Sequence, residues 1–337
     1  MRVEPTAAAD AQRPITTTAL PPRPVNAPIA PRGPTRLDKI STRLRTSFRT
    51  LVNIGQHFDQ LRALHGHTLA ELQRGHRSPN LQDYEFRVYS QWGEDGILQK
   101  LTRAIEIPNR TFIEFGVEDF TEANCRFLMV KDYWSGFVID GSPTAIRRLR
   151  AAYDNWRYDL GSTQAFITRE NINELLARSG FGPDLGILSV DIDGVDYHVL
   201  EAITGFQPRI LIVEYNAVFG AERAITVPYR ADYFRTAAHH SNLYFGASLA
   251  AFRHLADRLG YAFVGTTTAG VNAFFVRRDC VNDEIAALEQ TAGFTPSKVR
   301  ESRDAAGRPT LLTGDARLPL IRGLPVIDVL TGRTESL

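Results

Sequence analysis

The sequence predicts an α/β fold, namely a doubly wound, mostly parallel sheet that closes with an antiparallel hairpin. Three observations predict it. Short apolar runs alternate with helical patterns between residues 97 and 259, as in consecutive strand–helix units. Several of these runs end in a carboxylate. The last two runs, residues 261–264 and 272–277, are separated by a Thr- and Gly-containing turn short enough for a hairpin.

The composition is that of an ordinary globular chain. Of its 337 residues, 43% are hydrophobic and 23% are charged, and the net charge is +1. Such a balance gives no field that favours nucleic acid, and no apolar run approaches the roughly 20 residues of a membrane span. Cys125 and Cys280 are the only cysteines, which argues against a disulfide framework or a structural zinc site. We therefore expect a cytoplasmic protein that does not bind nucleic acid.

The chain is expected to contain four parts. Residues 1–36 hold eight of the 18 prolines and predict a disordered tail. Residues 37–80 form a helical arm, because apolar side chains recur there every three or four positions above a basic face. This arm could pack on the main domain, pair with a second subunit as a homo-oligomer, or lie on a membrane surface. Residues 81–282 form the main α/β domain, and residues 283–337 form a cap on it.

Within the main domain, each element follows from its local pattern. Residues 89–96 (Tyr-Ser-Gln-Trp-Gly-Glu-Asp-Gly) lead into a helix that carries Ile97, Leu98, Leu101 and Ile105. The expected strands cover residues 111–115, 136–139, 165–168, 187–190 and 209–214. The expected helices between and after them cover residues 121–131, 145–153, 172–178, 195–203 and 249–259.

Acidic residues gather where these strands end. The central run 187–190 is short and largely apolar, as in a strand buried on both faces, and Asp191, Asp193 and Asp196 follow it. Glu114, Asp140 and Glu214 end other strands. Right-handed crossovers bring the carboxyl ends of parallel strands to one edge, where open α/β sheets bind ligands. The sequence therefore predicts an active site at this edge.

The first two strands indicate the kind of cofactor. Gly116 follows the first strand, and a glycine there allows a ligand to approach the backbone closely. Asp140 ends the second strand, where an acid accepts the hydroxyls of a ribose. No Gly-x-Gly-x-x-Gly or phosphate-binding loop follows the first strand. The loop 117–119 is instead acidic, which repels a pyrophosphate and suits the cationic S-adenosylmethionine.

These residues resemble the FkbM-type class I methyltransferases. The resemblance rests on Phe-Ile-Glu-Phe-Gly at 112–116, on Asp140, on Asp-Ile-Asp-Gly-Val-Asp-Tyr-His-Val-Leu at 191–200 and on Ile-Leu-Ile-Val-Glu-Tyr-Asn at 210–216. The family usually has Glu where Asp193 and Asp196 stand, and more glycines beside Gly116. The resemblance implies a Rossmann-like methyltransferase domain. It also implies that the cofactor is surrounded by Gln91, Glu114, Gly116, Asp140, Ser142 and Asp191.

The resemblance further implies a metal, since class I methyltransferases acting on catechols or sugars often hold Mg²⁺ at these strand ends. Asp191, Asp193, Glu214 and Asn216 supply the oxygen ligands that such an ion prefers. The alternative is that the acids cap the following helix. A base for an acceptor hydroxyl is expected to be Asp193 or His198, with His239 and His240 as further candidates. The aromatic residues after the fifth strand either stack on the acceptor or form a packed lid; they are Tyr215, Tyr229, Tyr233, Tyr244 and Phe245.

The leading hypothesis is thus S-adenosylmethionine-dependent O-methylation of a small-molecule or glycan acceptor, such as a sugar, a glycan precursor or a secondary metabolite. A rival hypothesis is a metal-dependent glycosyltransferase, because Asp191-x-Asp193 matches the Asp-x-Asp that holds a metal and a nucleotide-sugar diphosphate. The single glycine after the first strand also permits a third hypothesis, a non-catalytic scaffold with a degenerate pocket. Titration with S-adenosylmethionine and with UDP-sugars distinguishes the three hypotheses. Binding of S-adenosylmethionine alone supports the methyltransferase, and binding of neither ligand supports the scaffold.

Overall fold

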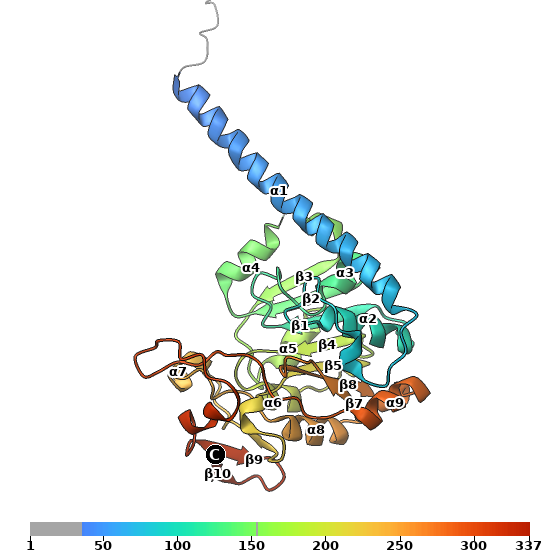
Figure 1. The fold of residues 1–337 in the computed structure, drawn as a ribbon, viewed down its shortest axis with the longest axis vertical. Helices are drawn as coiled ribbons and strands as arrows, with labels where there is room; N and C mark the ends of the chain where they lie inside the picture. The colour runs from blue at the N-terminus through green and yellow to red at the C-terminus, as the bar shows by residue number, and fades with distance from the viewer. Residues whose placement is uncertain (1–35, 153) are drawn as a thin grey trace, which may run out of the picture. The chain divides into compact units, whose positions relative to one another are not determined.

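The computed structural model describes residues 36–152 and 154–337, with side chains described at residue 50 and from residue 54 onward, residue 153 excepted. The tail predicted at residues 1–36 therefore lies outside the described part apart from its last residue. The chain divides into two compact units, residues 1–55 and 56–337. In the first unit the structure describes the amino-terminal half of helix α1 (Arg36–Gln73). The second unit contains every other element (Figure 1).

The second unit is built on a seven-stranded sheet in the order β3-β2-β1-β4-β5-β8-β7. Its strands are β1 (Thr111–Phe115), β2 (Ser135–Asp140), β3 (Leu160–Gln164), β4 (Ile187–Val190), β5 (Ile210–Glu214), β7 (Tyr261–Thr266) and β8 (Asn272–Arg277). Strands β1 to β5 run parallel, and β8 pairs antiparallel with both β5 and β7. The predicted fold, a doubly wound Rossmann-like sheet with a closing antiparallel hairpin, is confirmed.

Helices cover both faces of this sheet because successive strand residues point to opposite sides. Ile210 and Ile212 of β5 pack with residues of α2 (Glu94–Ala104), α3 (Arg126–Asp132), α4 (Pro143–Arg150) and α9 (Asp283–Thr291). Leu211 and Val213 pack instead with α5 (Ile172–Ala177), α6 (Asp196–Glu201) and α8 (Leu249–Arg258). The carboxyl edge of the sheet lies between these two layers and remains open for a site.

The third strand differs from the prediction. It covers Leu160–Gln164, not residues 165–168, and pairs in register from Gly136–Leu160 to Asp140–Gln164. Its sequence, Leu-Gly-Ser-Thr-Gln, is half-exposed at the edge of the sheet. An edge strand needs no continuous apolar run. The strand was therefore predicted in the following segment, residues 165–168, which is more apolar. That segment is a loop in which Ile167 is buried and Phe166 is exposed.

A second, three-stranded antiparallel sheet involves the carboxyl-terminal segment. Its order is β10 (Thr334–Ser336), β9 (Pro325–Asp328) and β6 (Ile225–Thr226). Val326 of β9 and the nearby Ile321 are fully buried in the main core. The short helix α7 (Arg235–Ala238) lies in the loop region after β6. Short 3₁₀ turns occur at Leu81–Tyr84, Asn155–Arg157, Ala217–Phe219, Arg278–Cys280, Gly314–Ala316 and Leu318–Leu320.

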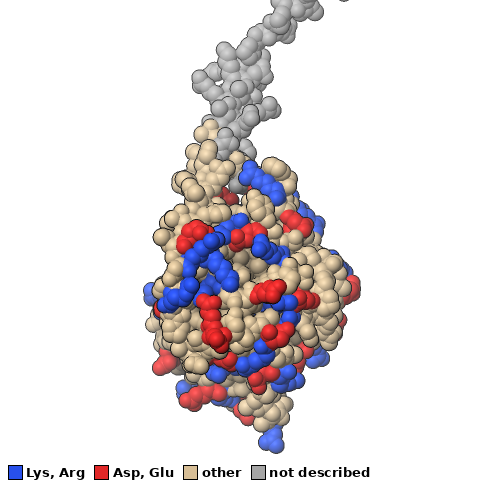
Figure 2. Space-filling model, turned by 90° about the vertical axis from the view of Figure 1, so that its right-hand side faces the viewer, with Lys and Arg blue, Asp and Glu red and all other residues tan. Residues whose placement is uncertain are grey.

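The surface carries charges of both signs. On the face drawn in Figure 2, basic and acidic side chains are interspersed, in keeping with the net charge of +1. No helix in the described residues has the length and apolar character needed to cross a bilayer.

Candidate functional site

A cavity of about 920 Å³ opens at the carboxyl edge of the sheet, where β1, β2, β4 and β5 end. The structure brings to this cavity most of the residues singled out in the sequence, which are Gln91, Glu114, Gly116, Asp140, Ser142, Asp191, Asp193, Glu214 and Asn216. A volume of this size is typical of small-molecule sites. The edge of the sheet that the sequence predicts as a site is therefore hollow.

Gly116 is required by the meeting of two strand ends. Its φ is +66°, and a Cβ there would lie 1.9 Å from the carbonyl oxygen of Asp191. Both the left-handed conformation and the close approach exclude a side chain. The glycine thus lets the end of β1 pack directly on the end of β4, beside the cavity.

Glu114 holds the loop that forms one wall of the cavity. Its buried carboxyl accepts hydrogen bonds from the backbone N–H groups of Asn124 (2.7 Å) and Cys125 (3.0 Å), just before α3. Burial raises the pKa of Glu114 to about 7, against the lowering effect of these bonds. The side-chain amide of Asn124 donates to Ser189 Oγ (3.1 Å), and this bond connects the same loop to β4. Glu114 therefore stabilises the loop of residues 117–125 through hydrogen bonds to its backbone.

Asp140 organises the end of β2. One carboxyl oxygen accepts from the backbone N–H of Glu118 (2.8 Å) and the other from that of Ser142 (2.6 Å). Ser142 caps α4 by accepting from Ala145 N (3.2 Å). Each oxygen of Asp140 keeps a further lone pair, and the residue borders the cavity. The carboxyl is thus held rigidly while retaining its capacity to accept hydroxyl donors.

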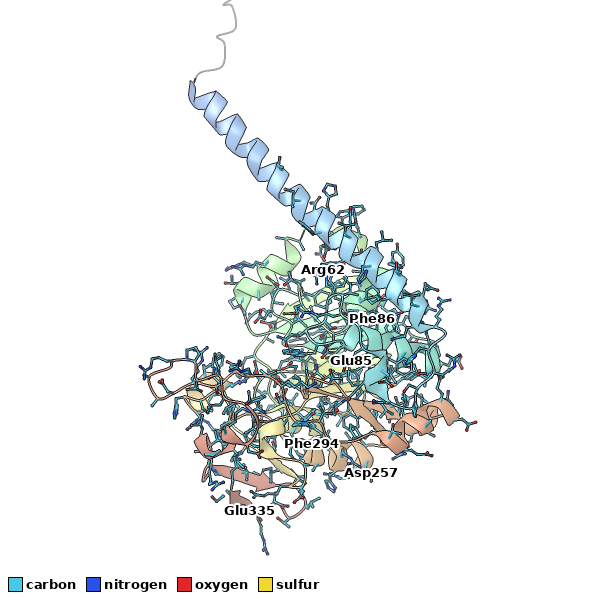
Figure 3. All side chains as sticks on the ribbon, viewed as in Figure 1. Arg62, Glu85, Phe86, Asp257, Phe294 and Glu335 are labelled. Atoms are coloured by element: carbon cyan, nitrogen blue, oxygen red, sulfur yellow. The ribbon has the colours of Figure 1, made fainter. Side chains whose placement is uncertain are left out.

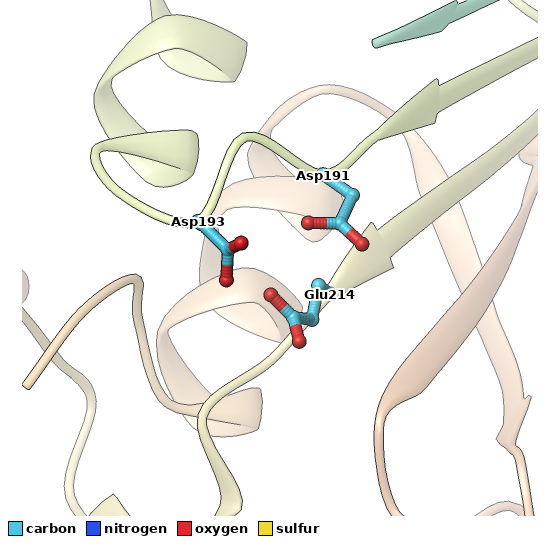
Figure 4. Close-up of side chains that lie close together, drawn as sticks. All are labelled: Asp191, Asp193 and Glu214. Carbon is cyan, nitrogen blue, oxygen red and sulfur yellow. The ribbon is translucent and has the colours of Figure 1, made fainter. Parts of the chain in front are cut away.

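Three carboxyl groups converge at the ends of β4 and β5. Asp191, Asp193 and Glu214 each offer an oxygen, and these oxygens lie within 4.8 Å of one another; Figure 4 shows the groups turned toward one another. Burial first, and then the neighbouring carboxylates, raise the pKa of both Asp191 and Glu214 well above the usual range. In the described part of the chain, Glu214 Oε2 has no hydrogen-bond partner. The cluster therefore favours a proton or a cation.

Asp196 shapes the loop that carries two of these acids. Its buried carboxyl accepts from Ile192 N (2.7 Å) and Gly194 N (2.9 Å), and burial raises its pKa to about 6. Between these contacts Asp193 adopts a φ of +55°, an unusual conformation for a residue with a Cβ. The role of Asp196 is to hold the turn, and the strained Asp193 extends into the cavity.

Arg235 is a site residue that the sequence did not reveal. It forms ion pairs with Asp193 and with Glu301, the latter at 3.2 Å. Its Nε donates to Asn242 O (2.8 Å), and its guanidinium lies 3.9 Å from the centre of the Phe245 ring. Glu301 comes from the carboxyl-terminal segment, so Arg235 joins that segment to the loop after β4. Neither the spacing nor a motif marks this arginine in the sequence.

The histidines do not reach the cavity. Nε2 of His198 lies 2.9 Å from Val227 O, and its ring packs against Tyr197 and Tyr229. His198, His239 and His240 are absent from the described cavity lining. Burial lowers the pKa of His198. The structure thus gives this predicted base a packing role on α6.

Asn216 borders the cavity, but its side chain is already engaged. Its amide donates to Leu243 O (2.8 Å) and Phe245 O (2.9 Å), and its oxygen accepts from Val218 N (3.0 Å). An amide with these partners ties loops together and is poorly suited to ligate an ion. The Asn216 side chain therefore ties loops together at the cavity, and its oxygen is less free for an ion than those of the three carboxylates.

Only some of the aromatic residues predicted after the fifth strand border the cavity. Tyr215, Tyr233 and Phe245 belong to its lining, whereas Tyr229 and Tyr244 do not. Tyr233 donates its hydroxyl to Tyr244 O, and Tyr215 donates to Thr295 O (2.5 Å). These bonds favour the packed-lid interpretation for the two tyrosines.

A further wall, also missed in the sequence, comes from the segment before α2. Glu94 accepts from Trp92 N (2.9 Å), and Asn272 donates its amide to the same carboxyl (2.7 Å). Trp92 and Asn272 both line the cavity beside Gln91. Trp92 Nε1 and Asn272 Oδ1 are buried and have no partner among the described residues. Buried polar atoms usually have a partner, so an unpartnered donor and an unpartnered acceptor set these two residues, like Glu214, apart from the rest of the cavity lining.

Comparison with known proteins adds little to this description. No protein-family model matches the chain, and no curated protein matches it in sequence. Among solved structures, it resembles an S-adenosylmethionine-dependent methyltransferase from Clostridium acetobutylicum at 7% identity, with 55% of this chain and 90% of that chain covered and a TM-score of 0.36.

Two other solved structures show a similar likeness. The N-terminal domain of EvdMO1, solved with SAH bound, is 9% identical, with 53% of this chain and 76% of that one covered and a TM-score of 0.33. An O-methyltransferase family protein from Burkholderia thailandensis is 14% identical, with 61% and 59% covered and a TM-score of 0.32. Scores this low do not bear on activity, and the fold class rests on the strand order.

Proposed function

We propose that the protein is an S-adenosylmethionine-dependent methyltransferase that acts on a hydroxyl of a small-molecule or glycan acceptor, such as a sugar, a glycan precursor or a secondary metabolite. One observation carries the proposal. The rigidly held Asp140 at the end of β2 and the carboxylates at the ends of β4 and β5 open into one cavity. A nucleoside whose ribose binds Asp140 can therefore extend to a reaction centre at the carboxylates of β4 and β5.

The residues present fit this cofactor. The free lone pairs of Asp140 suit the two hydroxyls of a ribose, as in other doubly wound folds. The acidic loop 117–119 and the carboxyl cluster favour a ligand with a sulfonium and an ammonium group. The unpartnered atoms of Trp92 and Asn272 match the carboxylate and ammonium of an amino acid. When bound, the cofactor supplies a methyl group on a positively charged sulfur.

The chain's own contribution is to place and deprotonate the acceptor hydroxyl. Burial and their mutual proximity raise the pKa of both Asp191 and Glu214. Either carboxylate is therefore a stronger base than an ordinary one once it has lost its proton. Asp193 is neutralised by Arg235 and serves better as a hydrogen-bond acceptor for the substrate. We therefore favour the Asp191–Glu214 pair as the base.

A divalent ion is a second way to use the same cluster. Asp191, Asp193 and Glu214 would hold it through carboxylate oxygens, the donors that Mg²⁺ prefers. Such an ion lowers the pKa of a bound hydroxyl. Calorimetric titration with Mg²⁺ alone, compared between the unchanged protein and Asp191→Asn, tests this independently of activity. Heat of binding that disappears in the variant supports the ion, and no heat in either protein argues for the Asp191–Glu214 pair as the base.

A glycosyltransferase requires cations facing the diphosphate of its donor. Two arginines line the cavity, and both are engaged. Arg235 pairs with Asp193 and Glu301, and the buried Arg317 donates to Ser297 O and Val299 O. Asp191 and Asp193 also converge with a third acid. These features favour a cationic ligand over a diphosphate.

The test is isothermal titration with S-adenosylmethionine, and separately with UDP-sugars plus Mn²⁺. We expect S-adenosylmethionine to bind. Asp140→Asn replaces a charged acceptor and should weaken binding about 10- to 100-fold, the effect of losing one or two hydrogen bonds to a charged group. Asp257→Asn, an exposed change on α8, is the matched control and should bind normally. Binding of UDP-sugar alone supports the glycosyltransferase, and binding of neither ligand supports the scaffold.

A further inference from the structure

The carboxyl-terminal half of α1, which belongs to the second unit, packs on the rest of that unit through small and polar residues. The side chain of Arg62, which is labelled beside α1 in Figure 3, donates to Val88 O, with Nε at 3.1 Å. A Cβ on Gly66 would lie 2.5 Å from a Val88 methyl group, so the helix backbone packs tightly there. Ala70 is fully buried, and the Gln73 amide donates to Tyr84 O (2.6 Å) and Gly96 O (2.9 Å). These contacts define one face of the helix.

Among the side chains that the structure describes in this helix, four large apolar ones from residue 58 onward lie on other positions and are exposed. Phe58 is 63% exposed, Leu61 is 59%, Leu64 is 64% and Leu72 is 72%. This is the reverse of an ordinary surface helix, whose apolar side faces the core. A run of exposed large apolar residues marks an interaction surface. The docked face does not use these side chains, so they are free to contact another molecule.

The sequence of α1 shows which kind of molecule fits. Starting at Leu37, apolar residues recur at intervals of seven. The positions of this first series are Leu37, Leu44, Leu51, Phe58, His65 and Leu72. A second series three residues later contains Ile40, Ser47, Ile54, Leu61 and Thr68. Only His65, Ser47 and Thr68 are polar, so the pattern is a heptad repeat across the whole helix.

A heptad repeat predicts a left-handed coiled coil, because the apolar seam stays in register only with another helix that has the same repeat. The helix has 38 residues and is therefore about 57 Å long at the usual rise. Its docked positions 59, 62, 66, 70 and 73 belong to neither series. The seam and the docked face are thus separate, and a partner helix can be added without undocking α1.

We propose that this seam, made by the two series above, pairs with the α1 helix of a second copy of the chain. The copy is the one molecule certain to carry the same repeat. An anionic membrane is a poorer match in the docked half. The neighbours of the exposed side chains there are Gln56, His57, Gln60 and Ala63, whereas membrane-surface helices place Lys and Arg beside the apolar face. The polar residues within the seam would help to set its register.

The experiment measures the mass of the full-length chain by sedimentation equilibrium between about 0.1 and 50 µM, a range that brackets typical coiled-coil affinities. We expect a dimer. Phe58→Gln combined with Leu61→Gln should raise the dissociation constant about 100-fold or more, because each subunit loses two buried apolar side chains. Leu311→Gln combined with Leu330→Gln removes two exposed apolar residues elsewhere and should leave the dimer unchanged.

The altered positions are exposed in the single chain, so both double variants should still fold. Because association itself stabilises a folded chain, their unfolding temperatures are compared at a concentration at which the unchanged protein is monomeric, where all three proteins should unfold at the same temperature. A second readout is Leu61→Cys, which should form a disulfide-linked dimer on mild oxidation, with a Leu330→Cys variant as control. A monomer at every concentration overturns the proposal, and so does a dimer that persists in the Phe58 and Leu61 variant. Binding of a monomeric protein to phosphatidylserine vesicles, lost in that variant, would assign the seam to a membrane instead.

Discussion

The carboxyl cluster at the ends of β4 and β5 makes a prediction about stability. Glu214→Gln keeps the shape of the side chain and removes one acid from the cluster. Because burial and the neighbouring carboxylates raise the pKa of Glu214 and of Asp191, ionising these groups in the folded protein costs free energy. The variant should therefore be more stable than the unchanged protein at neutral and higher pH.

The sign and size follow from proton linkage. A carboxyl whose folded pKa is raised binds its proton more tightly in the folded state than in the unfolded state. Its stabilising effect is complete below the unfolded pKa of about 4 and is lost as pH rises toward the folded value. The loss is at most about 1.4 kcal/mol per pH unit for each group. Between pH 5 and 7 one such carboxyl therefore changes the free energy of unfolding by up to about 2.7 kcal/mol.

The assay is urea unfolding at pH 5, 6, 7 and 8. The difference in free energy of unfolding between Glu214→Gln and the unchanged protein should grow with pH in favour of the variant. Glu335→Gln, which changes an exposed acid paired with Arg223, should shift stability by no more than about 0.5 kcal/mol at any pH. A constant difference, or a variant that is less stable at pH 8, would refute the reasoning.

Three further predictions follow from close contacts and charges. Gly116→Ala should destabilise the fold by more than about 1 kcal/mol, since the added Cβ would lie 1.9 Å from a carbonyl oxygen. The control is Gly182→Ala, whose added Cβ would have no atom within 4 Å and should not destabilise the fold in this way. Thermal unfolding compares the two variants. Gly66→Ala should loosen α1 and speed its proteolysis, while Gly75→Ala, with open space around it, should not. Arg235→Gln removes the cation that pairs with Asp193 and Glu301 and should lower the free energy of unfolding by about 1–3 kcal/mol at neutral pH; urea unfolding measures the change, and an unchanged free energy of unfolding would contradict the charge argument.

The fold was predictable where burial leaves a pattern in the sequence. Strands β4 and β5 are largely apolar and buried and have acids at their carboxyl ends, so both their position and their carboxyl ends could be located. Strand β3 was misplaced because it lies at the edge of the sheet, where Gly161 and Ser162 serve as well as apolar residues. The helix α3 begins at Arg126, later than expected, because the preceding residues form the loop that Glu114 holds.

The site was predictable only for residues fixed to strand ends. Asp140, Asp191 and Glu214 belong to this group, because the topology alone places them at one edge. Arg235 could not be found, since its place depends on how a long irregular loop folds back over the cavity. His198 illustrates the converse, because it belongs to the 191–200 motif but its side chain contacts Val227 O, Tyr197 and Tyr229. Contacts between loops determine the positions of the Arg235 and His198 side chains, and local sequence patterns carry no information about such contacts.

The central claim is that a nucleoside with a positively charged sulfur occupies the carboxyl edge of the sheet. A crystal structure of the protein with S-adenosylhomocysteine, the demethylated product, tests it most directly. The account predicts that both ribose hydroxyls lie within hydrogen-bond distance of Asp140 and that the sulfur faces Asp191 and Glu214. A ligand bound elsewhere, or a ribose turned away from Asp140, would contradict it.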